Sequence, residues 1–233
     1  MTPHAPLFCR EDGHTAALFP PRGGSEGLLC TVAAPPEAAA LWEALPPVRP
    51  ALVALCDVDW DRELSPWPAA KAFRGGKDFG GQADALLALL TGRLLPAAEA
   101  ALDFSPRWRG IGGYSLAGLF AVYAVFHTDR FDRLASMSGS LWFDGFAGAM
   151  ASWALPRPLT AAYFSLGDRE KETKSPRMAA VEQCTRAAAA RFAAEGVPTM
   201  LEMNPGGHFQ QVPQRTARGM GAVLPGSPAF IPQ

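Results

Sequence analysis

Basic clusters and long hydrophobic runs are both missing from this chain. Charged side chains make up 18% of the 233 residues, and the formal net charge is −1. Nucleic acids and anionic membrane surfaces are bound through clustered Lys and Arg side chains, and no such cluster occurs. No apolar run reaches the roughly 20 residues that a membrane-spanning helix needs. The sequence therefore predicts a protein that has neither nucleic acid nor membrane as a partner.

Two features of the sequence concern where the protein acts and whether it binds a metal. The first is that residues 1–14 lack the basic start and apolar centre of a secretion signal. The second is that cysteine is scarce and follows no metal-binding or redox pattern. The cysteines are scattered, without the C-x-x-C spacing that is typical of zinc sites and redox pairs: Cys9, Cys30, Cys56 and Cys184. We therefore expect a cytoplasmic protein with reduced thiols and no metal site.

What the chain does have is a high hydrophobic content, 48%, arranged in alternating segments. Strands are expected at residues 15–19 (an edge strand), 27–33, 50–56, 109–114, 133–138, 159–166 and 198–203. Helices are expected at residues 36–45, 82–90, 96–102, 116–126, 146–155, 178–195 and 212–224. In an alternative interpretation, residues 82–102 form one helix that is kinked by Pro96. This alternation predicts one α/β domain over residues 1–233. Its mainly parallel, doubly wound sheet would carry helices on both faces, a three-layer αβα sandwich.

One stretch joins a strand, a serine and a helix. Ser115 lies on the sharp turn between the strand at 109–114 and the apolar helix at 116–126. This arrangement is typical of the nucleophile elbow, whose strained turn presents a serine hydroxyl to a base and a substrate carbonyl. Gly113 and Ala117 are small enough for strand and helix to pass closely, although the usual G-x-S-x-G reads G-x-S-x-A. The alternative interpretation is that Ser115 is only a helix N-cap.

An acidic turn and a histidine follow two later strands. Asp168 and Glu170 come after the strand at 159–166, and His208 comes after the strand at 198–203. Ligands and catalytic groups in such sheets collect beyond the carboxyl ends of the strands. The order serine, acid, histidine along the chain is that of the α/β-hydrolases. Ser115 and His208 are therefore the candidate nucleophile and base.

Few histidines compete for the role of base. His4 and His14 lie in an N-terminal segment that we expect to be loose, and His127 ends the helix after Ser115, where a cation favours the helix dipole. His208 is the remaining candidate, and its alternative role is that of a turn histidine beside two glycines.

The acid that orients the histidine is open between Asp168 and Glu170. Glu170 is preferred because about three residues beyond Gly167 are needed to swing a side chain back over the sheet edge. The carboxylate that is not used would form a surface ion pair, with Arg169, Lys171 or Arg62.

An oxyanion hole needs backbone donors near the serine. The Leu116 N–H is the first, and the second is expected from the loop after the third strand, taken here as residues 57–60, with Val58 and Trp60 as candidates. Aromatic side chains around the site are expected either to line a substrate pocket or to serve ordinary packing: Trp60, Trp67, Tyr114 and Trp142.

Several of these segments together resemble one known family. Residues 111–123, 136–142, 166–170 and 206–209, with residues 62–68, look like the esterase D and enterochelin-esterase-like branch of the α/β-hydrolases. The resemblance covers most of the chain from about Pro50 onward.

The resemblance implies a serine carboxylic-ester hydrolase. It implies Ser115 as nucleophile, His208 as base and an acid within residues 167–170. Family members act on siderophore lactones, S-formylglutathione, feruloyl and other acyl esters, and some transfer acyl groups, so the family does not identify the substrate. The Ala117 departure is expected to cost little, because a methyl group is the smallest replacement for a glycine.

The connection at residues 141–158 has room for little more than one helix, so no large cap domain is expected. We hypothesise an open, shallow site rimmed by residues 60–79 and Trp142, suited to a bulky acyl ester as small-molecule substrate. Hydrolysis would pass through an acyl-enzyme on Ser115 and would need no metal or organic cofactor. The alternatives are an acyltransferase or peptidase of the same fold, or a member that only binds a ligand.

Overall fold

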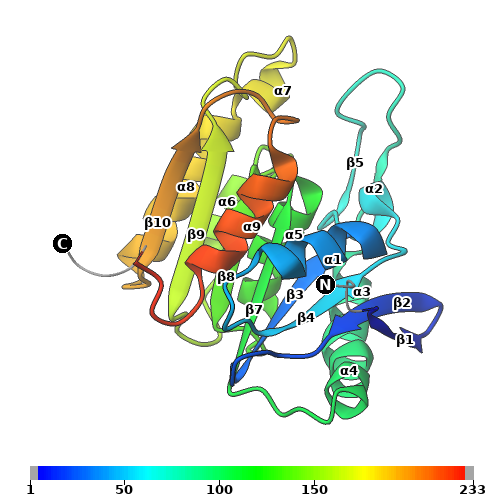
Figure 1. The fold of residues 1–233 in the computed structure, drawn as a ribbon. Coiled ribbons are helices and arrows are strands. Elements are labelled where there is room, and N and C mark those ends of the chain that lie inside the picture. Colours follow the sequence, from blue (N-terminus) through cyan, green and yellow to red (C-terminus); the bar gives the residue numbers. More distant parts are fainter. Residues whose placement is uncertain (1–4, 229–233) are drawn as a thin grey trace.

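The computed structural model describes residues 5–228, and within them eight strands form one large sheet (Figure 1). In spatial order these strands are β1 (Leu7–Glu11), β2 (His14–Phe19), β4 (Ala51–Leu55), β3 (Gly27–Val32), β7 (Trp108–Tyr114), β8 (Arg133–Met137), β9 (Ala161–Gly167) and β10 (Thr199–Asn204). From β4 to β10 all neighbours are parallel, whereas β2 runs antiparallel to both β1 and β4. The short strands β5 (Pro68–Ala69) and β6 (Phe79–Gly80) pair separately. The predicted mainly parallel sheet is confirmed.

Helices cover both faces of this sheet. The helices α1 (Pro35–Ala44) and α9 (Val212–Ala222) pack on one face, where they lie side by side (Figure 1). The other face is covered by α3 (Ala83–Leu89), α4 (Leu95–Ala101), α5 (Leu116–His127), α6 (Phe146–Ser152) and α8 (Val181–Ala194). Two short helices, α2 (Trp60–Glu63) and α7 (Pro176–Ala179), lie in connecting segments. The three-layer architecture follows from these two helical layers.

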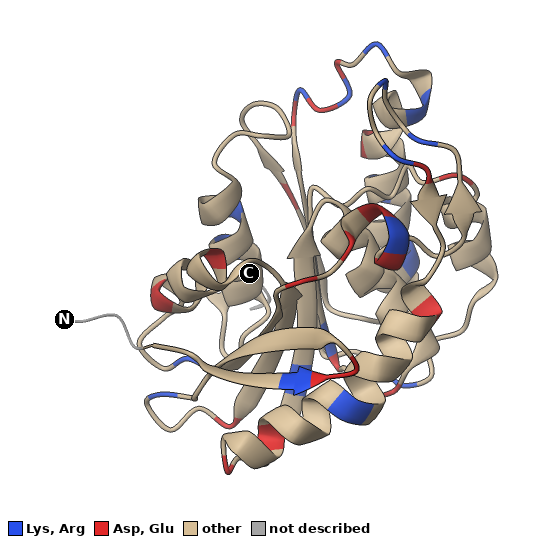
Figure 2. Cartoon of the chain, turned by 90° about the vertical axis from the view of Figure 1, so that its right-hand side faces the viewer, with Lys and Arg blue, Asp and Glu red and all other residues tan. Residues whose placement is uncertain are grey.

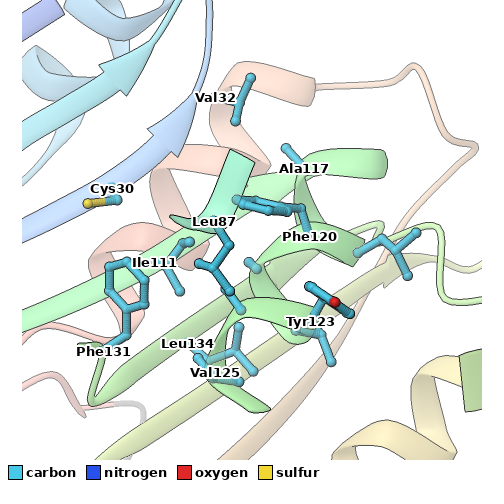
Figure 3. Packing of buried hydrophobic residues seen from close by; sticks show 14 of the residues in the cluster. Cys30, Val32, Leu87, Ile111, Ala117, Phe120, Tyr123, Val125, Phe131 and Leu134 are labelled. Atoms are coloured by element: carbon cyan, nitrogen blue, oxygen red, sulfur yellow. The ribbon is translucent and has the colours of Figure 1, made fainter. Parts of the chain in front are cut away.

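The strands alternate their side chains between two hydrophobic clusters, as a period of two residues requires. In β4, Val53 and Leu55 join the cluster beneath α3 and α5, while Leu52 and Ala54 join the cluster beneath α1 and α9. Figure 3 shows the first cluster, in which Leu87, Ile111 and Phe120 come together from a helix, a strand and a second helix. Such a strand is apolar throughout because both of its faces are covered.

The first strand, β1, was missed by the sequence patterns. It pairs with β2 at the edge of the sheet, and its Leu7 and Phe8 side chains are more than half exposed, 53% and 54%. An edge strand with little burial carries no clear hydrophobic alternation, so only its pairing identifies it. The expected edge strand, β2, is therefore an interior strand.

The N-terminal segment is also more ordered than expected. His14 belongs to β2, and its Nε2 lies 2.9 Å from Glu63 Oε1. The prediction that His14 is loose was therefore wrong, and His4 lies outside the described residues.

The helical segments expected on either side of Pro96 form one continuous stretch. A π-helical turn, Leu90–Leu94, connects α3 to α4, and the Leu95 N–H donates to the Leu90 carbonyl five residues earlier. Pro96 follows in the first turn of α4, where a missing N–H is tolerated. The wider turn thus carries the helix through the proline.

Charged residues are dispersed over the molecule. Figure 2 shows acidic and basic segments interspersed in loops and helices, with the central strands largely free of charge. In the described part of the chain, no helix is both long and apolar enough to span a membrane.

Candidate active site

Ser115 occupies the turn between β7 and α5 with an unusual backbone conformation. Its φ and ψ are 58° and −122°, a combination that costs a non-glycine residue conformational energy. The Ser115 N–H donates to Met137 O (3.1 Å), and its own carbonyl accepts from the Ser140 N–H (3.0 Å). Within residues 5–228 the Ser115 side chain makes no capping hydrogen bond. Ser115 thus occupies the N-cap position of α5 without capping the helix through its side chain, and the turn has a strained backbone geometry.

Gly113 allows β7 and α5 to pass closely. A Cβ atom at Gly113 would lie 2.5 Å from the Ala117 Cβ and 2.7 Å from the Ala117 carbonyl carbon. Contacts this short require the helix to move away from the strand. Because the Ala117 methyl already fills this space, the G-x-S-x-A form of the motif depends on glycine at position 113.

We expect Gly113→Ala to lower the free energy of unfolding by about 1–3 kcal/mol, through overpacking against α5. Adding Ala117→Gly should restore part of this loss, since it removes the methyl contact but leaves the backbone contact. Urea unfolding followed by circular dichroism measures the effect. The matched control is Gly148→Ala in α6, where a Cβ would meet nothing within 4 Å. Equal losses in Gly113→Ala and the control would contradict the explanation.

The structure brings Ser115, His208 and Glu170 into one hydrogen-bonded chain. The Ser115 Oγ lies 3.1 Å from His208 Nε2, and His208 Nδ1 lies 2.7 Å from Glu170 Oε2. A proton on Nδ1 donates to the carboxylate, which leaves Nε2 as the acceptor for the serine hydroxyl. The histidine is thereby held in the tautomer that a general base needs.

The Glu170 side chain is almost fully buried, and its carboxylate accepts several hydrogen bonds. Its Oε1 accepts from the Gly167 N–H (2.7 Å) and from the Ser138 hydroxyl (2.6 Å), and the side chain is 3% exposed. Burial by itself would raise the pKa of Glu170, but the hydrogen bonds from His208, Ser138 and Gly167 outweigh it, so the pKa lies below the ordinary carboxyl value. The carboxylate therefore stays ionised beside the histidine.

Asp168 lies on the same turn but does not contact His208. Its Oδ1 accepts from the Gly206 N–H at 2.8 Å, and a Cβ added at Gly167 would lie 2.3 Å from the Gly206 carbonyl oxygen. Asp168 thus connects the acid turn to the loop that carries His208, at a point where the two backbones nearly touch. Asp168 is the carboxylate that His208 does not use, and in the described structure it bonds to this backbone N–H and not to a surface cation as expected.

Sequence reasoning missed the groups that hold the loop of His208. Arg215 of α9 is 2% exposed and donates to the carbonyls of Pro205 (2.8 Å) and Gly207 (3.0 Å), with the same guanidinium 3.5 Å from Glu170 Oε1. The Tyr114 hydroxyl donates to the His208 carbonyl at 2.6 Å. No local pattern marks Arg215, because its partners lie in other loops.

Ser138 and Ser140 were also not assigned a role, although both follow β8 at the sheet edge where the site lies. Ser138 has a φ of 46° and donates to Glu170, and the Ser140 Oγ lies 3.3 Å from the Ser115 Oγ. The run of serines after a predicted strand was the available signal for them.

The loop expected to supply the second oxyanion donor was chosen from a strand count that the structure corrects by one. Because β1 was missed, β4 was counted as the third strand, but β3 is the third strand and the neighbour of β7. The loop after the third strand is therefore residues 33–36, and both its Ala33 and the Trp60 of the expected loop line the same cavity as Ser115. Its Ala33 N–H donates to Leu55 O, its Ala34 N–H donates to the Glu37 carboxylate, and two prolines follow.

Of the other candidates, the Leu116 N–H opens α5, where the first backbone donors have no helical partner. Val58 is buried in the hydrophobic core. Trp60 and Tyr114 line a cavity of about 570 Å³ that opens at Ser115.

Trp67 and Trp142 lie in an aromatic cluster and are not among the residues that line this cavity. Trp67 packs against Phe143 and donates from its indole N–H to Asp144 O (3.0 Å), and Trp142 packs edge-on against Phe79. They attach the loop around β5 and β6 to the loop after β8.

Ser115 is partly exposed, and the connection from β8 to β9 contains only the short helix α6. No large cap covers the nucleophile in the described structure. Within residues 5–228, no three His, Cys, Asp or Glu side chains are grouped so as to hold a metal ion.

Comparison with known proteins begins with the sequence. A family model described as Putative esterase matches residues 43–212. The uncharacterized protein YbbA of Bacillus subtilis (strain 168) is 30% identical over 115 residues, which are 48% of this chain and 46% of that protein. The chain thus spans about half the length of this curated relative.

Similar solved structures share the fold. They include an IroE-like serine hydrolase from Shewanella oneidensis (TM-score 0.72, 15% identity, 89% of this chain and 74% of that chain). The siderophore hydrolase EstB from Aspergillus nidulans has a TM-score of 0.65 at 18% identity and covers 95% of this chain and 94% of its own. The enterobactin esterase FES from Shigella flexneri has a TM-score of 0.64 at 22% identity, over 95% of this chain and 60% of its own. Because the family model matches most of its length, the chain belongs to the Putative esterase family.

Proposed function

We propose that the chain is a carboxylic-ester hydrolase that works through an acyl-enzyme on Ser115. The observation that carries the proposal is the hydrogen-bonded chain from the Ser115 hydroxyl through His208 to the Glu170 carboxylate. Membership of an esterase family supports the same reaction. The names of the structural neighbours, which are hydrolases and esterases, agree with it.

In the first step the Ser115 Oγ attacks the ester carbonyl carbon while His208 Nε2 takes the hydroxyl proton. The new C–O bond to Oγ makes a tetrahedral intermediate, and in this proposal the Leu116 N–H donates a hydrogen bond to its negative oxygen. The bond to the alcohol oxygen then breaks, and His208 returns the proton to that oxygen. The products of this step are the free alcohol and an acyl group on Ser115.

In the second step water replaces the alcohol. His208 takes a proton from water, the hydroxide adds to the acyl carbon, and the bond to Oγ breaks as the proton returns to Ser115. The buried Glu170 carboxylate stabilises the imidazolium that forms twice in the cycle. Carboxylic acid and alcohol are the net products of ester and water.

A fluorophosphonate probe tests the proposal with the wild-type protein. We expect one phosphonyl adduct per chain, on the proteolytic peptide that contains Ser115, and hydrolysis of p-nitrophenyl butyrate that stops as the adduct forms. Mass spectrometry locates the adduct, and absorbance follows the hydrolysis. A protein that neither reacts with the probe nor cleaves the ester faster than a heat-denatured sample would contradict the proposal.

A further inference from the structure

An apolar cavity runs away from Ser115 between two helices that are far apart in sequence. Its volume is about 570 Å³, and its walls come from α1, α9 and the end of β3, together with Trp60, Tyr114 and Ser115. Figure 1 shows α1 and α9 side by side over the same face of the sheet. A cavity of this size falls in the range of small-molecule sites.

The α1 wall is built for contact with an aliphatic group. Pro36, Ala40 and Ala44 recur at intervals of four residues, so they lie along one face of α1. Ala40 and Ala44 are exposed, and both line the cavity. From Pro36 to Ala44 the helix rises about 12 Å. The cavity therefore offers an apolar surface long enough for an extended chain of several methylene groups.

The α9 wall continues the same character. Val212, Pro213 and Ala217 line the cavity from α9, together with the polar Gln214 and Thr216. The carboxylate of Glu37, at the α1 end nearest the site, accepts a hydrogen bond from the Ala34 N–H. Small side chains on both helices keep the space between them open, because larger ones would fill it.

The position of His208 decides which half of an ester the cavity receives. His208 must give its proton to the leaving alcohol, so the alcohol lies beside Nε2. Among the described residues, Ser115 lines the cavity and His208 does not. The part of the ester that lies away from His208 is the acyl group, and it points into the cavity.

We infer that the cavity between α1 and α9 binds the acyl chain of the substrate, and that this chain is an unbranched aliphatic chain of medium length, such as octanoyl. The inference rests on the proposed esterase function and assigns a substrate class to the same site. The open site expected from the sequence would thus include one apolar arm, whose α1 residues Pro36, Ala40 and Ala44 are exposed. Each methylene group that leaves water for this arm strengthens binding by about two- to fourfold.

The experiment compares p-nitrophenyl acetate, butyrate and octanoate. With wild-type protein, kcat/KM should rise at least about tenfold from acetate to octanoate, because the added methylene groups enter the cavity. Ala40→Trp and Ala217→Trp place an indole in the cavity from opposite walls. Each should lower the octanoate-to-acetate ratio of kcat/KM by at least about tenfold. The matched control is Ala190→Trp. Ala190 is an exposed residue of α8, on the opposite face of the sheet, so this variant should keep the wild-type ratio.

A binding measurement separates this inference from the proposed reaction. Calorimetry with Ser115→Ala should detect binding of sodium octanoate and none of sodium acetate, and Ala40→Trp in that background should abolish the octanoate signal. If wild type cleaves the acetate ester but shows no gain with octanoate, and octanoate does not bind, the inference is overturned and the esterase function stands. If no ester is cleaved while octanoate still binds, the proposed function fails and the aliphatic-chain site stands.

Discussion

Ser115→Ala is expected to lower kcat/KM for p-nitrophenyl butyrate by roughly 10⁴- to 10⁶-fold, the largest effect of any single substitution in the chain. The Ser115 hydroxyl lies 3.1 Å from His208 Nε2, and Ser115 occupies the strained turn before α5. Among the described residues, no other group combines these two features. Without it no acyl-enzyme can form. Residual hydrolysis would come from substrate binding and the oxyanion donors alone.

The neighbouring serine supplies the matched control. Ser140 Oγ lies 3.3 Å from Ser115 Oγ, so a probe that reacted at either hydroxyl would give the same loss of activity. We expect Ser140→Ala to keep its fluorophosphonate adduct and Ser115→Ala to lose it. Both proteins should have wild-type circular dichroism, because each change removes one oxygen atom. An adduct that persists in Ser115→Ala would show that another residue is the nucleophile.

Glu170→Gln is expected to lower kcat/KM by roughly 10³- to 10⁴-fold. The amide cannot stabilise the imidazolium, and its NH₂ group competes with His208 Nδ1 as a donor, which favours the wrong tautomer. Asp168→Asn is the matched control on the same turn. The Asn carbonyl can still accept from the Gly206 N–H, so the loss should stay below about tenfold. Steady-state kinetics at neutral pH decides between the two acids, and a larger loss in Asp168→Asn would contradict the assignment.

A comparison of wild type with Glu170→Gln also tests the ionisation of Glu170. The folded pKa of Glu170 lies below the ordinary value of 4.5, so the carboxylate stabilises the folded state at pH values above 4.5. This contribution is lost as the pH falls through the lower folded pKa, because the folded and unfolded states then bind the same number of protons. We expect the difference in free energy of unfolding between wild type and Glu170→Gln to shrink as the pH falls below 4.5. A difference that is independent of pH would contradict the lowered pKa.

The elements around Ser115 could be predicted from the sequence because each has a strong local cause. The run of residues 51–55 is continuously apolar and is buried on both faces, as its pattern indicated. The α5 helix starts at Leu116 and is buried from Leu116 to Phe126. Gly113 and Ala117 indicated the close passage that the structure contains.

The position of a loop in the strand count could not be predicted from the sequence, because the count depends on pairing between strands. β1 is half-exposed, and only its hydrogen bonds to β2 define it as a strand. Missing one edge strand shifted the strand count, so that residues 57–60, which follow β4, were taken as the loop after the third strand. A correct list of local elements does not determine which strands are neighbours, because pairing depends on contacts between distant segments.

By itself the sequence determined the mainly parallel α/β architecture, the strained turn at Ser115 and the order of serine, acid and histidine, since hydrophobic periodicity and turn residues act over a few neighbours. Only the tertiary structure decided that Glu170 and not Asp168 meets His208, that Arg215 holds the loop of His208, and that an apolar cavity opens between α1 and α9. Each of these features brings together segments that are far apart in the sequence or side chains from different loops. Their distances are set by how the helices pack on the sheet, and this packing is a property of the whole chain.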